Sequence, residues 1–253
     1  MKTFGRIRNI LHVIVLSLSV CVVQFGRAAE GDVPIKRIIV AVSPVTAYHV
    51  TIGAVGLGAI GGAVKSSDTA EKSKQLTEKA RELGVPDIGA TIADGLEKEL
   101  AKRGYEIIRG KGVKVESPED SQTDAQPDAP QQEADAVLSV ILLSPGFRAQ
   151  HAVTDYHPNI RALVSLRDPK SRAVLHSTRV VYGDTYLSSG TTVLPVDSKY
   201  SYPSFEALLA NAGEAFEGLA KGVAPVVSAI ASGIPSEAKP GSATPSSGRG
   251  RRR

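Results

Sequence analysis

The amino-acid sequence predicts an α/β fold in which a mixed β-sheet of about five strands is packed by helices. Three observations lead to this prediction. An apolar run at 36–43, stopped by Pro44, is typical of a buried strand, and apolar side chains recur at helical spacing from Pro86 and again from Ser204. Four more strand-like stretches complete the pattern: 105–110, 134–143, 159–168 and 172–184. Strands and helices in this order form layers around one core.

Two helices are expected after the first strand. Asp68, with Glu71 three residues later, forms a capping pair that predicts a charged helix from Asp68 to Leu83. A second helix is expected from Pro86 to Gly104, because glycine readily adopts the left-handed conformation that ends a helix. Its apolar side chains recur four residues apart on one face: Ile88, Ile92, Leu96 and Leu100.

A hairpin and a final helix are expected in the second half of the chain. Apolar residues alternate from Ile160 to Leu166, Pro169 favours a turn, and 172–184 follows as the returning strand. The last helix is expected to be capped by Ser204 and to break or kink at Pro225. Its apolar face is directed at the sheet: Phe205, Leu208, Leu209, Ala212, Phe216, Leu219 and Val223.

Both ends of the chain are predicted to lie outside the folded domain of 29–234. Residues 1–28 have a basic start, a 14-residue apolar run and small residues before Ala29, which is typical of a signal peptide. The run contains Cys21, the single cysteine, and "LSVC" partly matches a lipidation motif. Residues 235–253 are rich in Pro, Gly, Ser and Arg and are expected to be a disordered basic tail.

Charge is distributed unevenly along the chain. The net charge of +4 equals the contribution of four basic residues in 1–28, where there are no acids, and four further arginines lie in the last five residues. The remainder is therefore negative, and we expect no nucleic-acid partner. Residues 115–135 carry seven acids and three prolines and are expected to be a disordered acidic loop.

A glycine-rich segment at 50–64 contains the spacing of a dinucleotide-binding loop. Gly56, Gly58 and Gly61 match Gly-x-Gly-x-x-Gly, but no second apolar strand ends in an acid about 20 residues later, so we expect no cofactor. As a helix, the segment would place Ala54, Gly58 and Gly62 on one face, a stripe suited to close helix packing in an oligomer or at a membrane surface. The alternative is a glycine-rich loop.

Two side-chain clusters are candidate sites. His151, Asp155 and His157 could hold a metal ion, although their spacing matches no recognised motif, and we expect no metal. His176 is expected to be an ordinary residue of a strand face. Four loop tyrosines could form a surface that binds a partner or a glycan, or could pack at the edge of the domain: Tyr182, Tyr186, Tyr200 and Tyr202.

The order of elements and their local amino-acid sequences resemble those of a group of exported domains. The quoted stretches are "IADGLEKELAKRGYEII", "ADAVLSV", "IRALVSLRDPKSRAVLHSTRVVYGD" and "FEALLANAGEAFEGLA". They are similar to the N-terminal domain of TolB, the curli-secretion lipoprotein and the lipoprotein activators of penicillin-binding proteins. The resemblance covers 36–224 and lacks a catalytic signature. It implies an exported, non-enzymatic assembly or scaffolding domain.

These observations together predict a periplasmic or outer-membrane-associated protein that is not an enzyme. Its expected partner is another envelope protein or a second copy of the chain, with peripheral membrane contact as a further role. The alternative is an envelope metal-binding protein or hydrolase that uses His151, Asp155 and His157.

Overall fold

The structure, a computed structural model, describes five stretches of the chain: 35–53, 59–111, 134–150, 154–183 and 190–235. All five belong to one unit, Pro34–Arg253, and within 59–67 the description covers the backbone alone. The predictions made for the signal peptide, Cys21, the acidic loop up to residue 133 and the tail from residue 236 lie outside the described residues.

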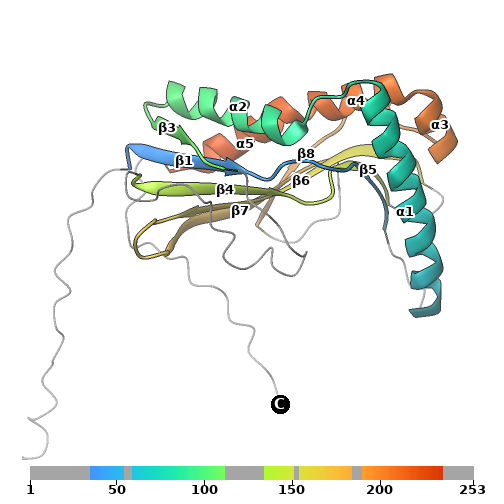
Figure 1. Ribbon diagram of the computed structural model, residues 1–253, viewed down its shortest axis with the longest axis horizontal. Coiled ribbons are helices and arrows are strands. Elements are labelled where there is room, and N and C mark those ends of the chain that lie inside the picture. The colour runs from blue at the N-terminus through green and yellow to red at the C-terminus, as the bar shows by residue number, and fades with distance from the viewer. Residues whose placement is uncertain (1–34, 54–58, 112–133, 151–153, 184–189, 236–253) are drawn as a thin grey trace, which may run out of the picture. The chain divides into compact units, whose positions relative to one another are not determined.

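Eight described strands form one mixed sheet (Figure 1). They are β1 Arg37–Val42, β2 His49–Ile52, β3 Glu106–Arg109, β4 Ala136–Leu142, β5 Gly146–Ala149, β6 His157–Arg167, β7 Val174–Tyr182 and β8 Thr191–Leu194. The prediction of about five strands was too low. The three missed strands, β2, β5 and β8, have four residues each, which leaves little alternating pattern, although the equally short β3 was predicted.

The long strand β6 organises the sheet. It pairs antiparallel with β7 on one side and with both β4 and β5 on the other, and β8 adds parallel to β7. The chain bends between β4 and β5 at Ser144, whose φ is +47°. Next come β1, parallel to β4, and β2, parallel to β5, and β3 is parallel to β1 at its outer side. The predicted hairpin is confirmed as β6 and β7.

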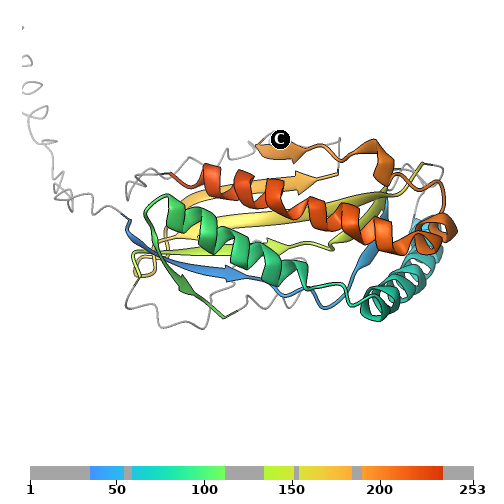
Figure 2. The ribbon, with the colours of Figure 1, turned by 90° about the horizontal axis from the view of Figure 1, so that it is seen from above.

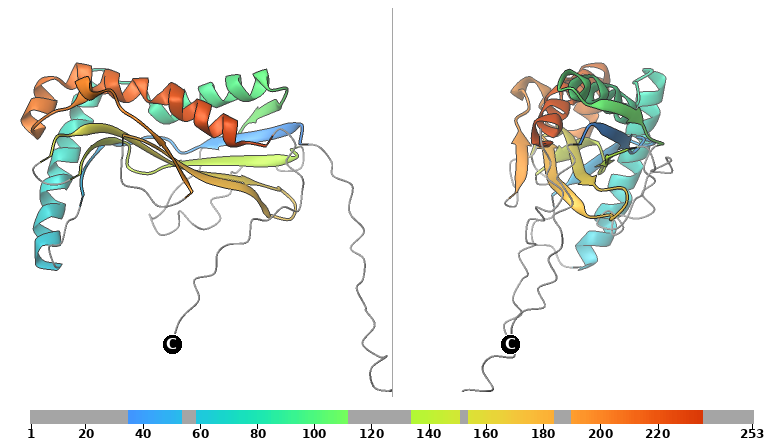
Figure 3. Two further views of the ribbon diagram at one scale, coloured as in Figure 1. Left: turned by 180° about the vertical axis from the view of Figure 1, so that it is seen from behind. Right: turned by 90° about the vertical axis from the view of Figure 1, so that its left-hand side faces the viewer.

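Three helices cover one face of the curled sheet (Figures 2 and 3). They are α2 Ile88–Lys102, α4 Ala212–Lys221 and α5 Val223–Gly233. Alternate strand residues point to these helices, as the sequence pattern predicted. The fully buried core includes Ile38, Leu138, Ile160 and Leu166 of the sheet and Ile92, Leu96, Leu100, Leu219, Val226 and Ile230 of the helices.

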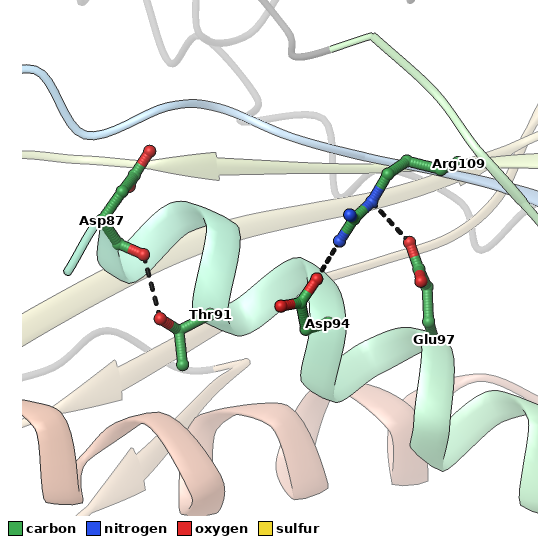
Figure 4. Close-up of polar contacts among 5 residues, drawn as sticks. All are labelled: Asp87, Thr91, Asp94, Glu97 and Arg109. Carbon is green, nitrogen blue, oxygen red and sulfur yellow. Dashed lines mark hydrogen bonds and ion pairs between the residues drawn. The ribbon is translucent and has the colours of Figure 1, made fainter.

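Helix α2 confirms its predicted amphipathic face and its end. It is capped by Asp87, whose carboxylate accepts from the Gly89 amide at 2.7 Å, and Gly104 follows it with a φ of +90°. Arg109 of β3 forms ion pairs with two carboxylates of α2, those of Asp94 and Glu97 (Figure 4). These groups are partly exposed, so each pair contributes at most about 1 kcal/mol.

The first helix starts earlier than the capping pair predicted. Helix α1 spans Ala59–Glu82, so Asp68 lies within it rather than at its N-terminus. Amides inside a helix already donate to the preceding turn, which leaves no free donor for a cap at this position. The Asp68 carboxylate instead accepts from the Lys72 ammonium at 2.8 Å.

The predicted last helix is three helices. Ser204 does cap α3 Phe205–Ala210, its hydroxyl accepting from the Ala207 amide at 3.1 Å. The breaks fall at Asn211 and Gly222, however, and Pro225 neither ends nor interrupts α5. Pro225 is the third residue of α5, and amides of a first helical turn have no acceptor within the helix, so its missing N–H removes no bond.

The turn between α2 and β3 binds the end of α5. The Arg103 guanidinium donates to the carbonyl of Ala231 and, at 3.3 Å, to that of Ile234. The Tyr105 hydroxyl donates to the carbonyl of Pro235 at 2.8 Å. These contacts satisfy carbonyls that the end of a helix leaves unpaired.

Candidate interaction surface

Helix α1 closes an open edge of the sheet. The amides of His49 and Gly53 donate toward β5, and because alternate amides of a strand face opposite sides, those of Tyr48 and Val50 face away from β5. Two hydroxyls of α1 accept these outward amides: Thr77 from Tyr48 at 3.0 Å and Ser73 from Val50 at 2.9 Å. Covering an edge strand in this way prevents it from pairing with a strand of another molecule.

The local sequence explains why α1 can do this. Ser73 and Thr77 are four residues apart and share one helix face with Leu76, which is fully buried. Each hydroxyl donates to the carbonyl four residues earlier, Ser73 to Thr69 at 2.6 Å and Thr77 to Ser73 at 2.8 Å. Their lone pairs remain available for β2. A Ser/Thr pair at this spacing was the signal that sequence reasoning missed.

We expect the double variant Ser73→Ala/Thr77→Val to lose about 2–6 kcal/mol of unfolding free energy, since each removed hydroxyl leaves a part-buried amide unsatisfied at about 1–3 kcal/mol. Hydrogen exchange at Tyr48 and Val50 should accelerate. Thr91→Val is the matched control, because the exposed Thr91 hydroxyl bonds only within its own helix. Equal exchange rates in the double variant and wild type would contradict the closure.

An open groove of 640 Å³ lies between α1 and β2. It is lined by Ala47, His49, Val50, Thr69, Ala70, Ser73, Lys74, Thr77, Glu78 and Arg81. Lys74, Glu78 and Arg81 form an exposed stripe on α1, and within the described part of the chain none of the three forms an ion pair. Burial lowers the pKa of His49, so its imidazole is uncharged at neutral pH. The groove therefore offers charged groups to a partner.

Two hydroxyls that line the groove are already engaged in hydrogen bonds within the fold. The hydroxyls of Ser73 and Thr77 both donate to carbonyls and accept from amides, so neither is held by a general base. Burial and the nearby Asp87 carboxylate raise the pKa of Tyr48 to about 12, which keeps this phenol protonated. Among the residues that the structure describes, no three His, Cys, Asp or Glu side chains cluster as metal ligands.

The predicted metal candidates are only partly described. His151 lies outside the described residues. Asp155 is exposed, and its carboxylate accepts a hydrogen bond from the Ser201 hydroxyl. His157 begins β6 opposite Arg148. The Asp155 carboxylate therefore already accepts a hydrogen bond from a hydroxyl. Metal binding by His151, Asp155 and His157 together stays a prediction.

The predicted tyrosine surface is not at the surface. Tyr182, Tyr200 and Tyr202 are 4%, 1% and 4% exposed, which corresponds to the packing alternative, and Tyr186 lies outside the described residues. Two glycines make room for two of the rings: Gly218 of α4 for Tyr200, and Gly222, between α4 and α5, for Tyr182. Sequence alone could not show this, because the glycines lie far along the chain.

Charged groups contact the Tyr200 ring and its hydroxyl. The ammonium groups of Lys199 and Lys221 lie 4.5 and 5.5 Å from the ring centroid. The Tyr200 hydroxyl donates to the Glu217 carboxylate at 3.3 Å. These cation–π contacts and the hydrogen bond hold the ring against α4.

The glycine-rich segment divides between elements. Residues up to Ile52 belong to β2, and α1 begins at Ala59, so the helical interpretation holds for the backbone of its last part, which includes Gly62. Ala54 and Gly58 lie outside the described residues. Within the described stretches, no helix combines the length and apolar character needed to cross a membrane.

Known proteins resemble this chain only distantly. No family model matches the sequence, and no curated protein sequence is similar to it. Similar solved structures include a PelC dodecamer from Paraburkholderia phytofirmans (12% identity, 78% of this chain and 86% of that one, TM-score 0.32). Protein XCC0632 of Xanthomonas campestris, of the DUF330 family, has 10% identity, coverage of 79% and 85% and a TM-score of 0.34. Lipoprotein GNA1162 of Neisseria meningitidis has 14% identity, coverage of 61% and 88% and a TM-score of 0.23.

These structural neighbours are distant. The α/β class predicted from the sequence is confirmed by the structure itself, as a curled mixed sheet with helices on one face. The finer resemblance to TolB-type domains stays a prediction.

Proposed function

We propose that this chain is an exported, non-enzymatic protein of the cell envelope that acts in assembly, and that α1 is the element that contacts its partner. One observation carries the proposal. Helix α1 has 24 residues, about 36 Å at 1.5 Å per residue, whereas β2 has four residues, about 13 Å. Figures 1 and 3 show the N-terminal end of α1 running past the sheet.

The chemistry of α1 supports a role in contact with another helix. Its first six residues, 59–64, read "AIGGAV" and carry no charge. Small side chains such as Gly61 and Gly62 let two helices approach closely, and the uncharged stretch gains by leaving water. The second half of α1 carries the exposed Lys74, Glu78 and Arg81, which add charge-based selectivity beside the apolar end.

The leader predicted at 1–28 supports export, and the hydroxyls committed to β2 support a binding role. The partner is a second copy of the chain or a helix of another envelope protein. Either partner would contact the same surface of α1, so a change to that surface would abolish the binding of either one. Peripheral contact with a membrane is a further role open to the same uncharged stretch.

We expect Gly62→Val to reduce self-association or partner capture at least tenfold, because a branched side chain separates the two helices by more than their packing tolerates. The measurement is light scattering of the purified mature protein, together with a pull-down from envelope extracts. Gly213→Val is the matched control, since Gly213 also lies in a helix and has no neighbour within 4 Å of an added Cβ. Unchanged association of Gly62→Val, or a cytoplasmic location of the protein, would refute the proposal.

A further inference from the structure

The face of the sheet opposite α2, α4 and α5 is rich in arginine. In β6, Arg161 lies between the core residues Ile160 and Ala162, and Arg167 follows the core residue Leu166, so these two arginines point to the opposite face. Arg148, opposite His157, and Arg179, opposite Leu163, pair with β6 residues of that same face. All four are half-buried. We call these four side chains and the strands that carry them the arginine face.

The arginine face has an apolar floor and little negative charge. Ile39 and Ala41 of β1 are 0% exposed there, although the described helices that cover the sheet lie on its other side (Figure 2). Among the described strand residues of this face, Glu106 is the acid, and it pairs with Arg37 at 3.4 Å. The arginine face therefore has the chemistry to hold an acidic, partly apolar segment.

The strand order identifies the segment of this chain that connects strands next to the arginine face. β3 and β4 lie on opposite sides of β1, both parallel to it. The amide of Gly110 donates to Val40 at 2.9 Å, and that of Asp135 to Arg37 at 3.0 Å. The chain therefore leaves β3 near the carboxyl end of β1 and enters β4 near its amino end. The 22 residues 112–133 make this return.

The handedness of crossovers selects the side of the return. The connection from β1 to β3 includes α2, which packs on β1 from the helix-covered side. Crossovers between parallel strands are almost always right-handed, so we expect a connection that moves in the opposite direction, from β3 across β1 to β4, to lie on the opposite side of the sheet. That side is the arginine face.

Charge complementarity identifies the occupant. Residues 112–133 contain one basic residue, Lys114, and six acids: Glu116, Glu119, Asp120, Asp124, Asp128 and Glu133. Carboxylates and guanidinium groups form paired hydrogen bonds, and they attract more strongly where water is partly excluded. We propose that the acidic segment 116–133 of this chain docks on the arginine face, where it occupies the surface that an external anionic partner would need.

Limited digestion with proteinase K tests the docking in the full chain. At about 50 mM salt we expect cleavage within 112–133 to be at least tenfold slower than in a free peptide of the same sequence. High salt, near 1 M, should remove most of this protection, because it screens the ion pairs. The double variant Arg161→Gln/Arg179→Gln should remove it at low salt, whereas the control Arg81→Gln/Arg172→Gln, at exposed positions, should keep it.

A second variant leaves the sheet untouched in case the arginine variant does not fold. Replacing the six acids by their amides should also release the segment and accelerate cleavage at least tenfold. Wild-type cleavage as fast as in the peptide, or protection that persists in the amide variant, would overturn the proposal. So would binding of the wild-type chain to phosphatidylglycerol vesicles that is lost in Arg161→Gln/Arg179→Gln, because an external anion would then be the occupant.

Discussion

Replacing Gly218 by alanine is expected to destabilise the domain by about 1–3 kcal/mol, the usual cost of overpacking a filled core. A Cβ at Gly218 would lie 2.5 Å from Cγ of Tyr200, whose ring is 1% exposed. The same argument holds for Gly222→Ala, where Cδ1 of Tyr182 would lie 2.4 Å away. Neither ring can move without breaking its hydrogen bond, that of Tyr200 to Glu217 or that of Tyr182 to the Gly218 carbonyl.

Gly213→Ala is the control on the same helix. An added Cβ there meets no atom within 4 Å, so the variant should gain up to about 1 kcal/mol from helix propensity alone. Urea unfolding measures all three variants. Gly218→Ala as stable as Gly213→Ala would show that the tyrosine rings are not held as described.

Truncating Phe147 to alanine is expected to cost about 3–5 kcal/mol of unfolding free energy, the usual cost of removing a buried phenyl ring. Phe147 is 1% exposed, and its ring packs edge-on against those of Phe216 at 5.8 Å and Tyr202 at 6.4 Å. The Phe216 ring also packs against the Tyr48 ring, with their centroids 5.0 Å apart. The cavity would therefore lie where β5, β2 and α4 meet, and aromatic pair energies would be lost with it.

Val193→Ala is the control for this cavity, because Val193 is 43% exposed in the edge strand β8. Its loss should remain within about 0.5 kcal/mol. Thermal unfolding and urea titration measure both variants. A Phe147→Ala variant within 1 kcal/mol of wild type would mean that the aromatic cluster contributes little to stability.

Patterns that repeat along the chain led to correct predictions. The alternation from Ile160 to Leu166 and the four-residue steps from Ile88 to Leu100 both correspond to buried faces in the structure. Such repeats work because helix and strand geometry sets which side chains share a face. The cap at Ser204 was also predictable, since it depends on an amide only three residues away.

Features that depend on distant parts of the chain were missed. Asp68 with Glu71 has the pattern of a cap, but a longer helix incorporates it and removes the donors that a cap needs. Tyr182 and Tyr200 were proposed as surface tyrosines, yet Gly218 of α4 and Gly222, between α4 and α5, create the space that buries them. Of the four-residue strands, β2, β5 and β8 were missed, because so short a stretch carries little pattern and each strand is defined by pairing with a neighbouring strand.

The sequence by itself determined the class of this protein: an α/β domain with amphipathic helices, a hairpin, a predicted export leader and no recognised catalytic motif. Those properties follow from local periodicity and composition. Only the tertiary structure decided that Ser73 and Thr77 close the edge of β2, that the tyrosines are core residues and that four arginines share one face of the sheet. Each depends on which strands become neighbours, and strand pairing is set by long-range packing rather than by nearby residues.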